Sequence, residues 1–278
     1  MKEKYNLKLA ISNIAWNVEE EGDIFPLLKE MDVEGIEIAP TKYWPNPSKA
    51  STQEIEVVRS RINSFGFRIP SAQALLYGHP DLTIFRDEET RKRSLEYIIN
   101  ISLLCSSLGV STLVFGSPKN RQRNGLPLDL ALEIASDFFF QVAENISTYN
   151  ITLCIEPNPI EYGCDFITNS ADALILVQRV DHPNFRLHLD TSAMFLNRED
   201  PASIIVQCFP YLHHFHISEP YLGLIGYSQN DHLTVAKTLR KSGYDGWISI
   251  EMRSGLKASN KDAIHHALEY VKKTYMEQ

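Results

Sequence analysis

The sequence predicts a single (β/α)8 barrel over residues 1–278, and three observations lead to this fold class. Short β-branched or apolar runs alternate with longer stretches of helical period, which is typical of parallel strands joined by right-handed crossovers. Eight such units fit within 278 residues, close to the usual length of a barrel. No glycine-rich phosphate loop follows the first strand, which disfavours an open doubly wound sheet.

Each predicted strand is a short apolar run, and each predicted helix is a longer amphipathic stretch that follows it. The strands are predicted at Leu7–Ile14, Gly35–Ile38, Arg68–Ala72, Thr112–Phe115, Thr152–Ile155, Phe185–Leu189, His213–Ile217 and Trp247–Ile250. The helices are predicted at Ile24–Met31, Thr52–Phe65, Glu88–Leu108, Asp129–Thr148, Ser170–Arg179, Asp200–Cys208, His232–Lys241 and Asn260–Met276. Gly109 and Gly243 follow two of these helices by one or two residues, where a left-handed terminal residue is expected.

Composition narrows the class of partner. The formal net charge is −8, so the surface repels phosphate backbones and we expect no nucleic-acid partner. No apolar run approaches the roughly 18 residues that cross a bilayer, so we expect no membrane partner. The N-terminus shows no secretory pattern, and the four cysteines form no CxxC pair. We therefore expect reduced cysteines in a cytoplasmic protein.

Ionisable side chains stand at the ends of the last four predicted strands. In a barrel the carboxyl ends of the strands form the active site. Glu156 follows the fifth strand, Asp190 the sixth and Glu251 the eighth, while His216 lies near the end of the seventh. Because side chains alternate between the faces of a strand, these residues should point to the barrel mouth. The preceding residues should then point outward, toward the helices: Ile155, Leu189, Phe215 and Ile250.

These four side chains have the composition of a metal site. A lone Glu at a strand end usually caps a helix or faces solvent, but matched positions on consecutive strands favour a shared role. Three carboxylates that converge repel one another, and a divalent cation neutralises that charge. Oxygen-rich ligation with one imidazole suits Mn²⁺, which we favour, or Mg²⁺ and Co²⁺, while Zn²⁺ and Fe²⁺ are also compatible.

The same motifs resemble a known family. Ile155-Glu156-Pro157-Asn158, Leu189-Asp190-Thr191, His216-Ile217-Ser218-Glu219 and Ile250-Glu251 are similar to the xylose isomerase-like TIM barrel superfamily, in its sugar phosphate isomerase/epimerase branch. The resemblance implies that one metal is held by Glu156, Asp190, His216 and Glu251. It further implies that Glu156 and Glu251 are the acid/base pair that moves a proton next to a carbonyl, through an enediolate stabilised by the metal.

Three positions depart from the pattern of the ketose 3-epimerases in that superfamily. Those enzymes carry a Glu six residues after the first ligand, a His three after the Asp ligand and an Arg six after the His ligand. Here these positions are Tyr162, Ala193 and Leu222. The metal site therefore carries over, whereas the substrate does not.

Several further residues are candidates for substrate contact or for support of the site. Lys119 and Arg121 belong to a basic run after the fourth strand, which suits a phosphate or carboxylate, or is simply a solvated loop. His188 shares the inward face with Asp190, and Glu37 is a candidate partner of a metal ligand. The other substrate-binding candidates are Gln73, Arg253 and Trp16, the last forming an apolar wall with Tyr43 and Trp44.

The expected activity is therefore a metal-dependent isomerase or epimerase of a sugar, sugar phosphate or sugar acid. The alternative is a dehydratase of a cyclic polyol ketone, which would begin with the same deprotonation. A nuclease of the endonuclease IV type is a remote alternative. Such enzymes bind three metals and need additional histidines on the earlier strands, where this chain has Gln73 and Ser117. The partner is a carbohydrate-like small molecule, and a homodimer or homotetramer is compatible with such barrels although no sequence stripe specifies one.

Overall fold

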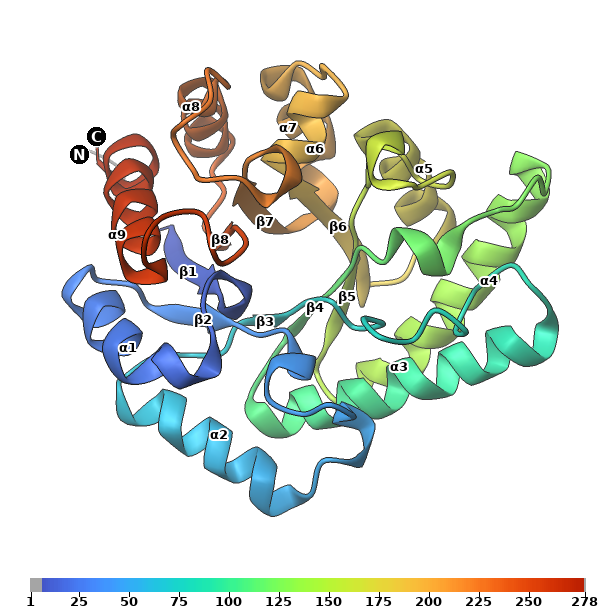
Figure 1. The fold of residues 1–278 in the computed structure, drawn as a ribbon. Helices are drawn as coiled ribbons and strands as arrows, with labels where there is room; N and C mark the ends of the chain where they lie inside the picture. The colour runs from blue at the N-terminus through green and yellow to red at the C-terminus, as the bar shows by residue number, and fades with distance from the viewer. Residues whose placement is uncertain (1–6, 278) are drawn as a thin grey trace.

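Eight parallel strands form a nearly closed barrel in the computed structural model, which describes residues 7–277 (Figure 1). The strands are β1 (Lys8–Ser12), β2 (Gly35–Glu37), β3 (Ser71–Ala72), β4 (Thr112–Phe115), β5 (Thr152–Ile155), β6 (Phe185–Asp190), β7 (Leu212–Ser218) and β8 (Trp247–Glu251). Their order in the sheet is β2-β1-β8-β7-β6-β5-β4-β3, so the first and last strands pair directly. The predicted fold class is confirmed.

The barrel closes between β2 and β3 through isolated bridges. Gly35 pairs with Arg68 and Ile38 pairs with Ala72, outside the named ladders. The β3 strand has two residues, Ser71–Ala72, where the sequence predicted five. Pro70 explains the difference, because a proline has no N–H to donate to a ladder.

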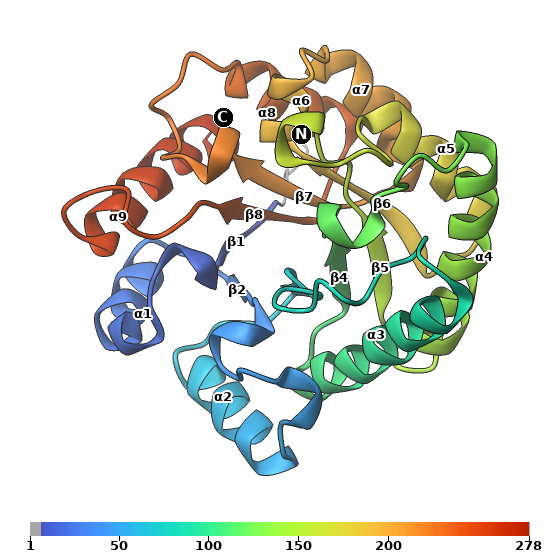
Figure 2. The same cartoon turned by 45° about the vertical axis from the view of Figure 1, so that its right-hand side comes forward.

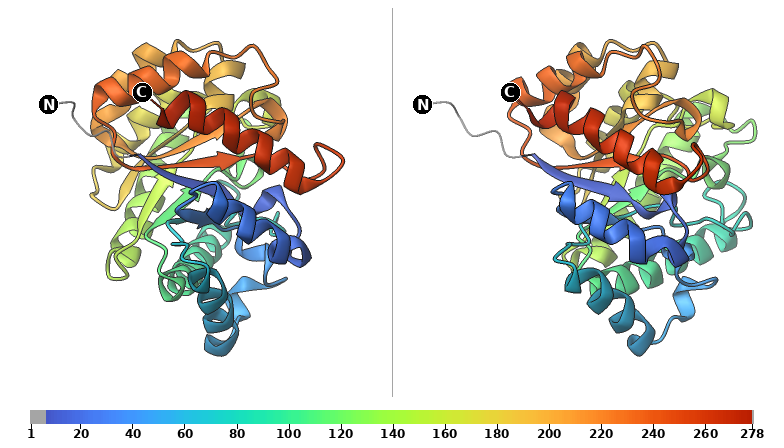
Figure 3. Two further views of the ribbon diagram at one scale, coloured as in Figure 1. Left: turned by 90° about the vertical axis from the view of Figure 1, so that its left-hand side faces the viewer. Right: turned by 60° about the vertical axis from the view of Figure 1, so that its left-hand side comes forward.

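The helices surround the strands in chain order, as the turned views show (Figures 2 and 3). They are α1 (Glu21–Glu30), α2 (Thr52–Ser64), α3 (Glu88–Leu108), α4 (Leu128–Ser147), α5 (Ser170–Val180), α6 (Thr191–Leu196), α7 (Pro201–Cys208), α8 (His232–Ser242) and α9 (Asn260–Val271). Gly109 and Gly243 end α3 and α8 in the left-handed region, with φ of 85° and 76°. Within residues 7–277, no helix has the length and apolarity needed to cross a membrane.

Helix α6 was not predicted from the sequence. It begins at Thr191, directly after β6, and the Asp190 side chain caps it by accepting hydrogen bonds from the N–H groups of Ser192 and Ala193. A six-residue helix has too few turns to show a hydrophobic period, so only its cap marks it in the sequence. This cap fixes Asp190 at the mouth of the barrel.

The two faces of the strands differ in chemistry. Ile155, Leu189, Phe215 and Ile250 are completely buried and belong to the hydrophobic cluster between the strands and the helices. Buried polar side chains also occur on the strands, and several of them are joined to Glu37 by hydrogen bonds: Ser71, His214, His216 and Ser249. His188, also completely buried, lies beside them. This alternation agrees with the predicted outward and inward faces and leaves a polar centre below the mouth.

Candidate metal and active site

Four consecutive strands bring the predicted ligands together. Glu156 follows β5, Asp190 ends β6, His216 lies in β7 and Glu251 ends β8. The parallel register pairs Asp190 with His216 and places Ser218 opposite Glu251. One donor atom from each of the four ligands lies within 4.8 Å of the others, which is the spacing of a site for one ion.

The four ligands differ slightly in exposure. His216 is completely buried and Asp190 is 5% exposed, whereas Glu156 and Glu251 are each 9% exposed. The His216 Nδ1 atom lies 3.5 Å from Glu251 Oε2 and 3.8 Å from Glu156 Oε1. The two glutamates therefore lie close to one imidazole nitrogen, and each keeps a small exposed surface.

The carboxyl groups of Glu156 and Asp190 both have raised pKa values. Burial raises the pKa of Glu156, and the charges of Glu251 and Asp190 raise it further. Burial and the charge of Glu251 likewise raise the pKa of Asp190. Both carboxyl groups thus keep their protons to a higher pH than usual, because buried negative charges stand close together. A cation that they share would lower both pKa values again.

One unpaired atom tests whether a metal fits. The His216 Nδ1 atom is buried and has no hydrogen-bond partner, although it faces two carboxylates. A buried polar atom without a partner is costly, and an imidazole nitrogen with a lone pair is a metal ligand. With the three carboxylates around it, the donor set fits a divalent cation.

Glu37 fixes the opposite side of the His216 ring. Its carboxylate lies 2.9 Å from His216 Nε2 and 2.8 Å from His214 Nε2, and it accepts further hydrogen bonds from Ser71 and Gln73. Burial alone would raise the pKa of Glu37, but the imidazoles of His216 and His214 hold it well below its ordinary value. Burial lowers the pKa of His216, but the charges of Glu37 and Glu251 outweigh it and raise the pKa well above its ordinary value, so the ring favours its protonated form between these carboxylates. A cation at Nδ1 would replace the proton there and leave Nε2–H donated to Glu37.

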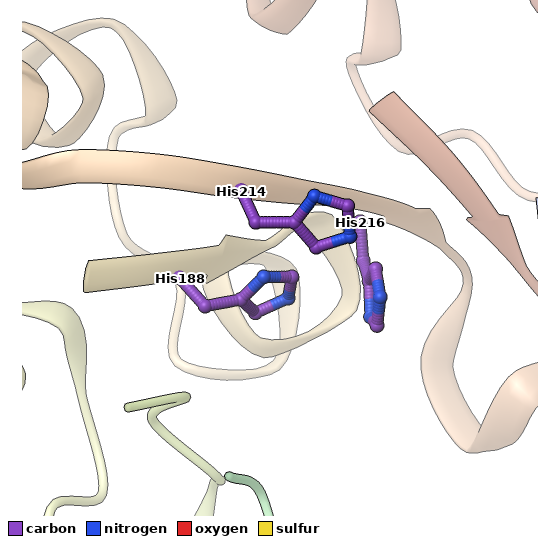
Figure 4. A group of neighbouring side chains, drawn as sticks. All are labelled: His188, His214 and His216. Atoms are coloured by element: carbon purple, nitrogen blue, oxygen red, sulfur yellow. The ribbon is translucent and has the colours of Figure 1, made fainter. Parts of the chain in front are cut away.

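His188 lies beside this arrangement on β6, as Figure 4 shows together with His214 and His216 of β7. Its ring centroid is 4.1 Å from that of His216, and its Nε2 atom is 3.5 Å from Glu156 Oε1. Neither ring nitrogen has a hydrogen-bond partner. Burial, with the neighbouring imidazoles, lowers the pKa of His188 well below the ordinary value, so the ring is neutral. The three histidines form a second, deeper group of possible ligands.

Gly116 leaves the space that Glu156 occupies. It follows β4, and a Cβ atom added there would overlap the Glu156 Oε2 atom. Any larger residue would displace this carboxylate from the site. Asn158 also lines the mouth close to Gly116.

A cavity of about 720 Å³ opens above the ligands. Glu156, Asp190 and Glu251 lie at its inner end. The predicted substrate contacts Gln73 and Lys119 also line it, and so do Tyr162 and Leu222, two of the positions that depart from the ketose 3-epimerase pattern. Its size is that of a pocket for a small organic molecule.

The structure places the other predicted substrate contacts away from this cavity, in contrast to expectation. Arg121 is completely buried and donates a hydrogen bond of 2.7 Å to the Glu156 carbonyl oxygen, so it supports the main chain. Trp16 is also completely buried and packs edge-on against Phe25. Arg253 is exposed and does not line the cavity, and His188 lies below it, completely buried.

Sequence reasoning missed several residues that shape the site. Ser218 donates a short hydrogen bond to Asp190 Oδ1, and the Tyr162 hydroxyl lies 3.1 Å from that of Ser192. Ser218 stands two residues after His216, and this period-two spacing is a signal that could have found it. Ser192 and Tyr221 are positioned by a helix and a loop that carry no such period.

An eight-stranded barrel with carboxylates and an imidazole at its mouth is an architecture of metal-dependent enzymes. The chain matches the xylose isomerase-like TIM barrel family over residues 25–274, and it belongs to that family. This confirms the predicted family.

Individual relatives point to sugars. The chain is 30% identical over 111 residues to a ketose 3-epimerase of Arthrobacter globiformis, a match that covers 40% of this chain and 38% of that protein. It is 24% identical over 251 residues to a probable ketose 3-epimerase of Synechocystis, covering 88% and 84% of the two chains. The comparisons support the expected sugar isomerase or epimerase.

A solved structure agrees in fold along nearly the whole chain. The 3-keto-D-glucoside 4-epimerase of E. coli superposes with a TM-score of 0.81 at 21% identity, over 96% of this chain and 100% of that one. At this identity the likeness shows the fold alone.

Proposed function

We propose that this protein is a divalent-metal-dependent epimerase or isomerase of a sugar, sugar phosphate or sugar acid. The observation that carries the proposal is that Glu156 and Glu251 both lie within 3.8 Å of His216 Nδ1 and both line one cavity, to which they are slightly exposed. The ketose 3-epimerases among its relatives support a ketose as the reacting group. Mn²⁺ is the metal that we favour, held by Glu156, Asp190, His216 and Glu251.

The two glutamates are suited to move one proton in opposite directions. In the reaction that we propose, one carboxylate oxygen takes the proton from the carbon next to the carbonyl. The electron pair of that C–H bond forms a C=C bond, and the π pair of the carbonyl moves to its oxygen, which gives an enediolate. The other glutamate, as a carboxylic acid, returns a proton to the opposite face of the same carbon and inverts it. A bound divalent cation would stabilise the negative charge that develops on the substrate oxygens.

The buried position of Glu156 suits this role. Burial raises the pKa of the carboxyl group and makes it a stronger base, whereas a bound cation would lower that pKa, so burial would offset part of the basicity that the metal removes. Gly116 and the main chain held by Arg121 keep this carboxylate in place. If the proton returned to the neighbouring carbon instead, the same residues would perform an aldose–ketose isomerisation.

Deuterium exchange tests the proposal. The purified protein, supplied with Mn²⁺, is incubated in D₂O with a panel of free ketoses, sugar phosphates and uronates, and incorporation is followed by NMR. We expect deuterium at one carbon next to a carbonyl, and a loss of about 100-fold or more in Glu156→Gln and in Glu251→Gln. Glu161→Gln is the matched control, because Glu161 is exposed and does not line the cavity. Exchange that survives in both active-site variants would refute the assignment.

A further inference from the structure

The cavity above the metal ligands has two chemically different parts. Its inner end is polar, with Glu156, Asp190 and Glu251. Its outer part is lined largely by aromatic and aliphatic side chains, which come from the loops after β3, β5 and β7. They include Leu76, Tyr77, Tyr162, Tyr221 and Leu222. The reacting end of a substrate and the rest of it therefore meet different surroundings.

Two tyrosines at the rim of the cavity, Tyr77 and Tyr221, are exposed to solvent. Tyr77 is 72% exposed and Tyr221 is 62% exposed, although both line the cavity. Exposed aromatic rings beside a cavity lose little conformational entropy when a ligand covers them, because a tyrosine has few rotatable bonds. The rim therefore offers apolar surface that the protein itself does not cover.

The aromatic corner at Tyr221 is held in one arrangement. The Tyr162 and Tyr221 rings meet edge to face with centroids 5.7 Å apart, and the Tyr162 hydroxyl accepts a hydrogen bond of 3.0 Å from the Tyr221 N–H. Tyr221 and Leu222 both adopt left-handed backbone conformations, with φ of 60° and 55°. Such conformations are costly for these residues and gather at ligand-binding sites. The corner is thus shaped before any ligand arrives.

Charge disfavours an anionic group in the outer part. Among the cavity-lining residues that the structure describes, Lys119 is the one with a lysine or arginine side chain. Arg121 is turned to the Glu156 carbonyl oxygen, and Arg123 donates to the carbonyl oxygens of Asp165 and Leu126. Phosphate recognition usually combines several cationic or N–H donors, so a neutral group suits these walls better.

The size of the cavity exceeds what one sugar ring needs. Liquid water occupies about 30 Å³ per molecule, so a volume of about 720 Å³ corresponds to about two dozen waters, whereas a hexose has only about a dozen non-hydrogen atoms. A single ketose bound at the proposed metal ligands would leave the aromatic side chains of the rim in contact with water. A longer molecule would reach both parts of the cavity.

We propose that Tyr77, Tyr162, Tyr221 and Leu222 form a subsite for a second, uncharged ring that is joined by a glycosidic bond to the reacting sugar. The apolar face of such a ring would cover Tyr221, while the reacting sugar would lie on the inner carboxylates. The identity of the reacting sugar rests on the function proposed above, but the ring subsite is a property of the rim alone.

Binding to the protein without metal tests the subsite independently of catalysis. The purified full-length chain, treated with chelator, is titrated with phenyl β-D-glucopyranoside and with glucose, and saturation-transfer NMR reports which protons contact the protein. We expect transfer to the phenyl protons and a dissociation constant at least about fivefold lower than that of glucose. Tyr221→Ala should remove this advantage, whereas Tyr227→Ala should keep it, because Tyr227 is 69% exposed but lies outside the cavity lining. Equal binding of the two sugars, or unchanged binding in Tyr221→Ala, would overturn the subsite.

Deuterium exchange in the metal-loaded protein separates the two proposals. A ketose that carries a glycosidic phenyl group, a ketose within a disaccharide and the free ketose are compared by kcat/KM. If the free ketose exchanges as fast as both glycosides, the subsite is wrong and the proposed function stands. If no sugar exchanges but the phenyl glucoside still binds through Tyr221, the proposed function is wrong and the subsite stands. A faster phenyl derivative assigns the second ring as aromatic, and a faster disaccharide assigns it as a sugar.

Discussion

The Glu37 carboxylate lies 2.9 Å from the Nε2 atom of His216, whereas the Nδ1 atom of the same ring faces Glu156 and Glu251. When a cation replaces the proton on Nδ1, this contact would keep the remaining hydrogen on Nε2 and so leave the Nδ1 lone pair for the metal. Glu37 and His216 are 179 positions apart in the chain and meet only because β2 and β7 belong to one barrel. The fold thus prepares the one nitrogen ligand of the site.

Glu37→Gln should therefore weaken metal binding although it replaces none of the four proposed ligands. An amide supports the His216 tautomer less well than a carboxylate, and removing such a partner typically costs about 10-fold to 100-fold in metal affinity. Calorimetric titration with Mn²⁺ measures the dissociation constant. Glu34→Gln, at a residue exposed just before β2, is the control and should bind as the wild type does. Unchanged affinity in Glu37→Gln would mean that the contact is only structural.

Metal affinity should rise with pH, and binding should release protons. The raised pKa values of Glu156 and Asp190 mean that these groups hold protons above the ordinary carboxyl range when no metal is present. A cation binds the ionised forms, so it competes with these protons until the pH exceeds the raised pKa values. Calorimetry in buffers of different ionisation enthalpy counts the protons. Glu156→Gln should release fewer protons when Mn²⁺ binds. A metal affinity that does not change between acidic and neutral pH would contradict this prediction.

Gly116→Ala should disturb the site through sterics alone. The added methyl group would overlap Glu156 Oε2 and push that carboxylate away from the other ligands. Overpacking of this kind typically costs about 1–3 kcal/mol, which corresponds to at least about fivefold in Mn²⁺ affinity if the cost falls on the bound state. Gly22→Ala is the matched control, because a Cβ atom there meets nothing within 4 Å. Equal Mn²⁺ affinity in the two variants would show that the Glu156 carboxylate can avoid the added methyl group and still bind the metal.

His188→Phe should separate stability from activity. Both ring nitrogens of His188 are buried without partners, so an apolar ring of similar shape should leave the melting temperature unchanged or raise it. Proton exchange should fall, because Glu156 Oε1 would lose the polar group 3.5 Å away. Differential scanning calorimetry and deuterium incorporation report the two effects. A variant that is less stable but equally active would assign His188 to the core.

The strand-end pattern made much of the site predictable. Glu156, Asp190 and Glu251 stand at or directly after the ends of regular strands, and the period of two sets the face on which each side chain lies. The alternation of strands and helices predicted the barrel in the same way. Both predictions rest on the spacing of residues along the chain, because the regular geometry of a strand or helix sets the direction in which each side chain points.

The other features of the site depend on contacts between distant parts of the chain, which the spacing of residues in the sequence does not predict. Arg121 is in a basic run that resembles a solvated or phosphate-binding loop, yet the fold buries it against the main chain of Glu156. Trp16 lies after a strand as the proposed ligand Glu156 does, but it packs into the core instead. The orphaned Nδ1 atom of His216 and the space left by Gly116 are visible only in three dimensions.

The most direct test of the account is a crystal of the protein grown with Mn²⁺ and measured on both sides of the manganese absorption edge. We predict one strong anomalous peak, with Glu156, Asp190, Glu251 and the Nδ1 atom of His216 within about 2.0–2.6 Å of it. A peak among His188, His214 and His216 instead, or no peak at saturating Mn²⁺, would contradict the proposed metal site and the proton transfer built upon it.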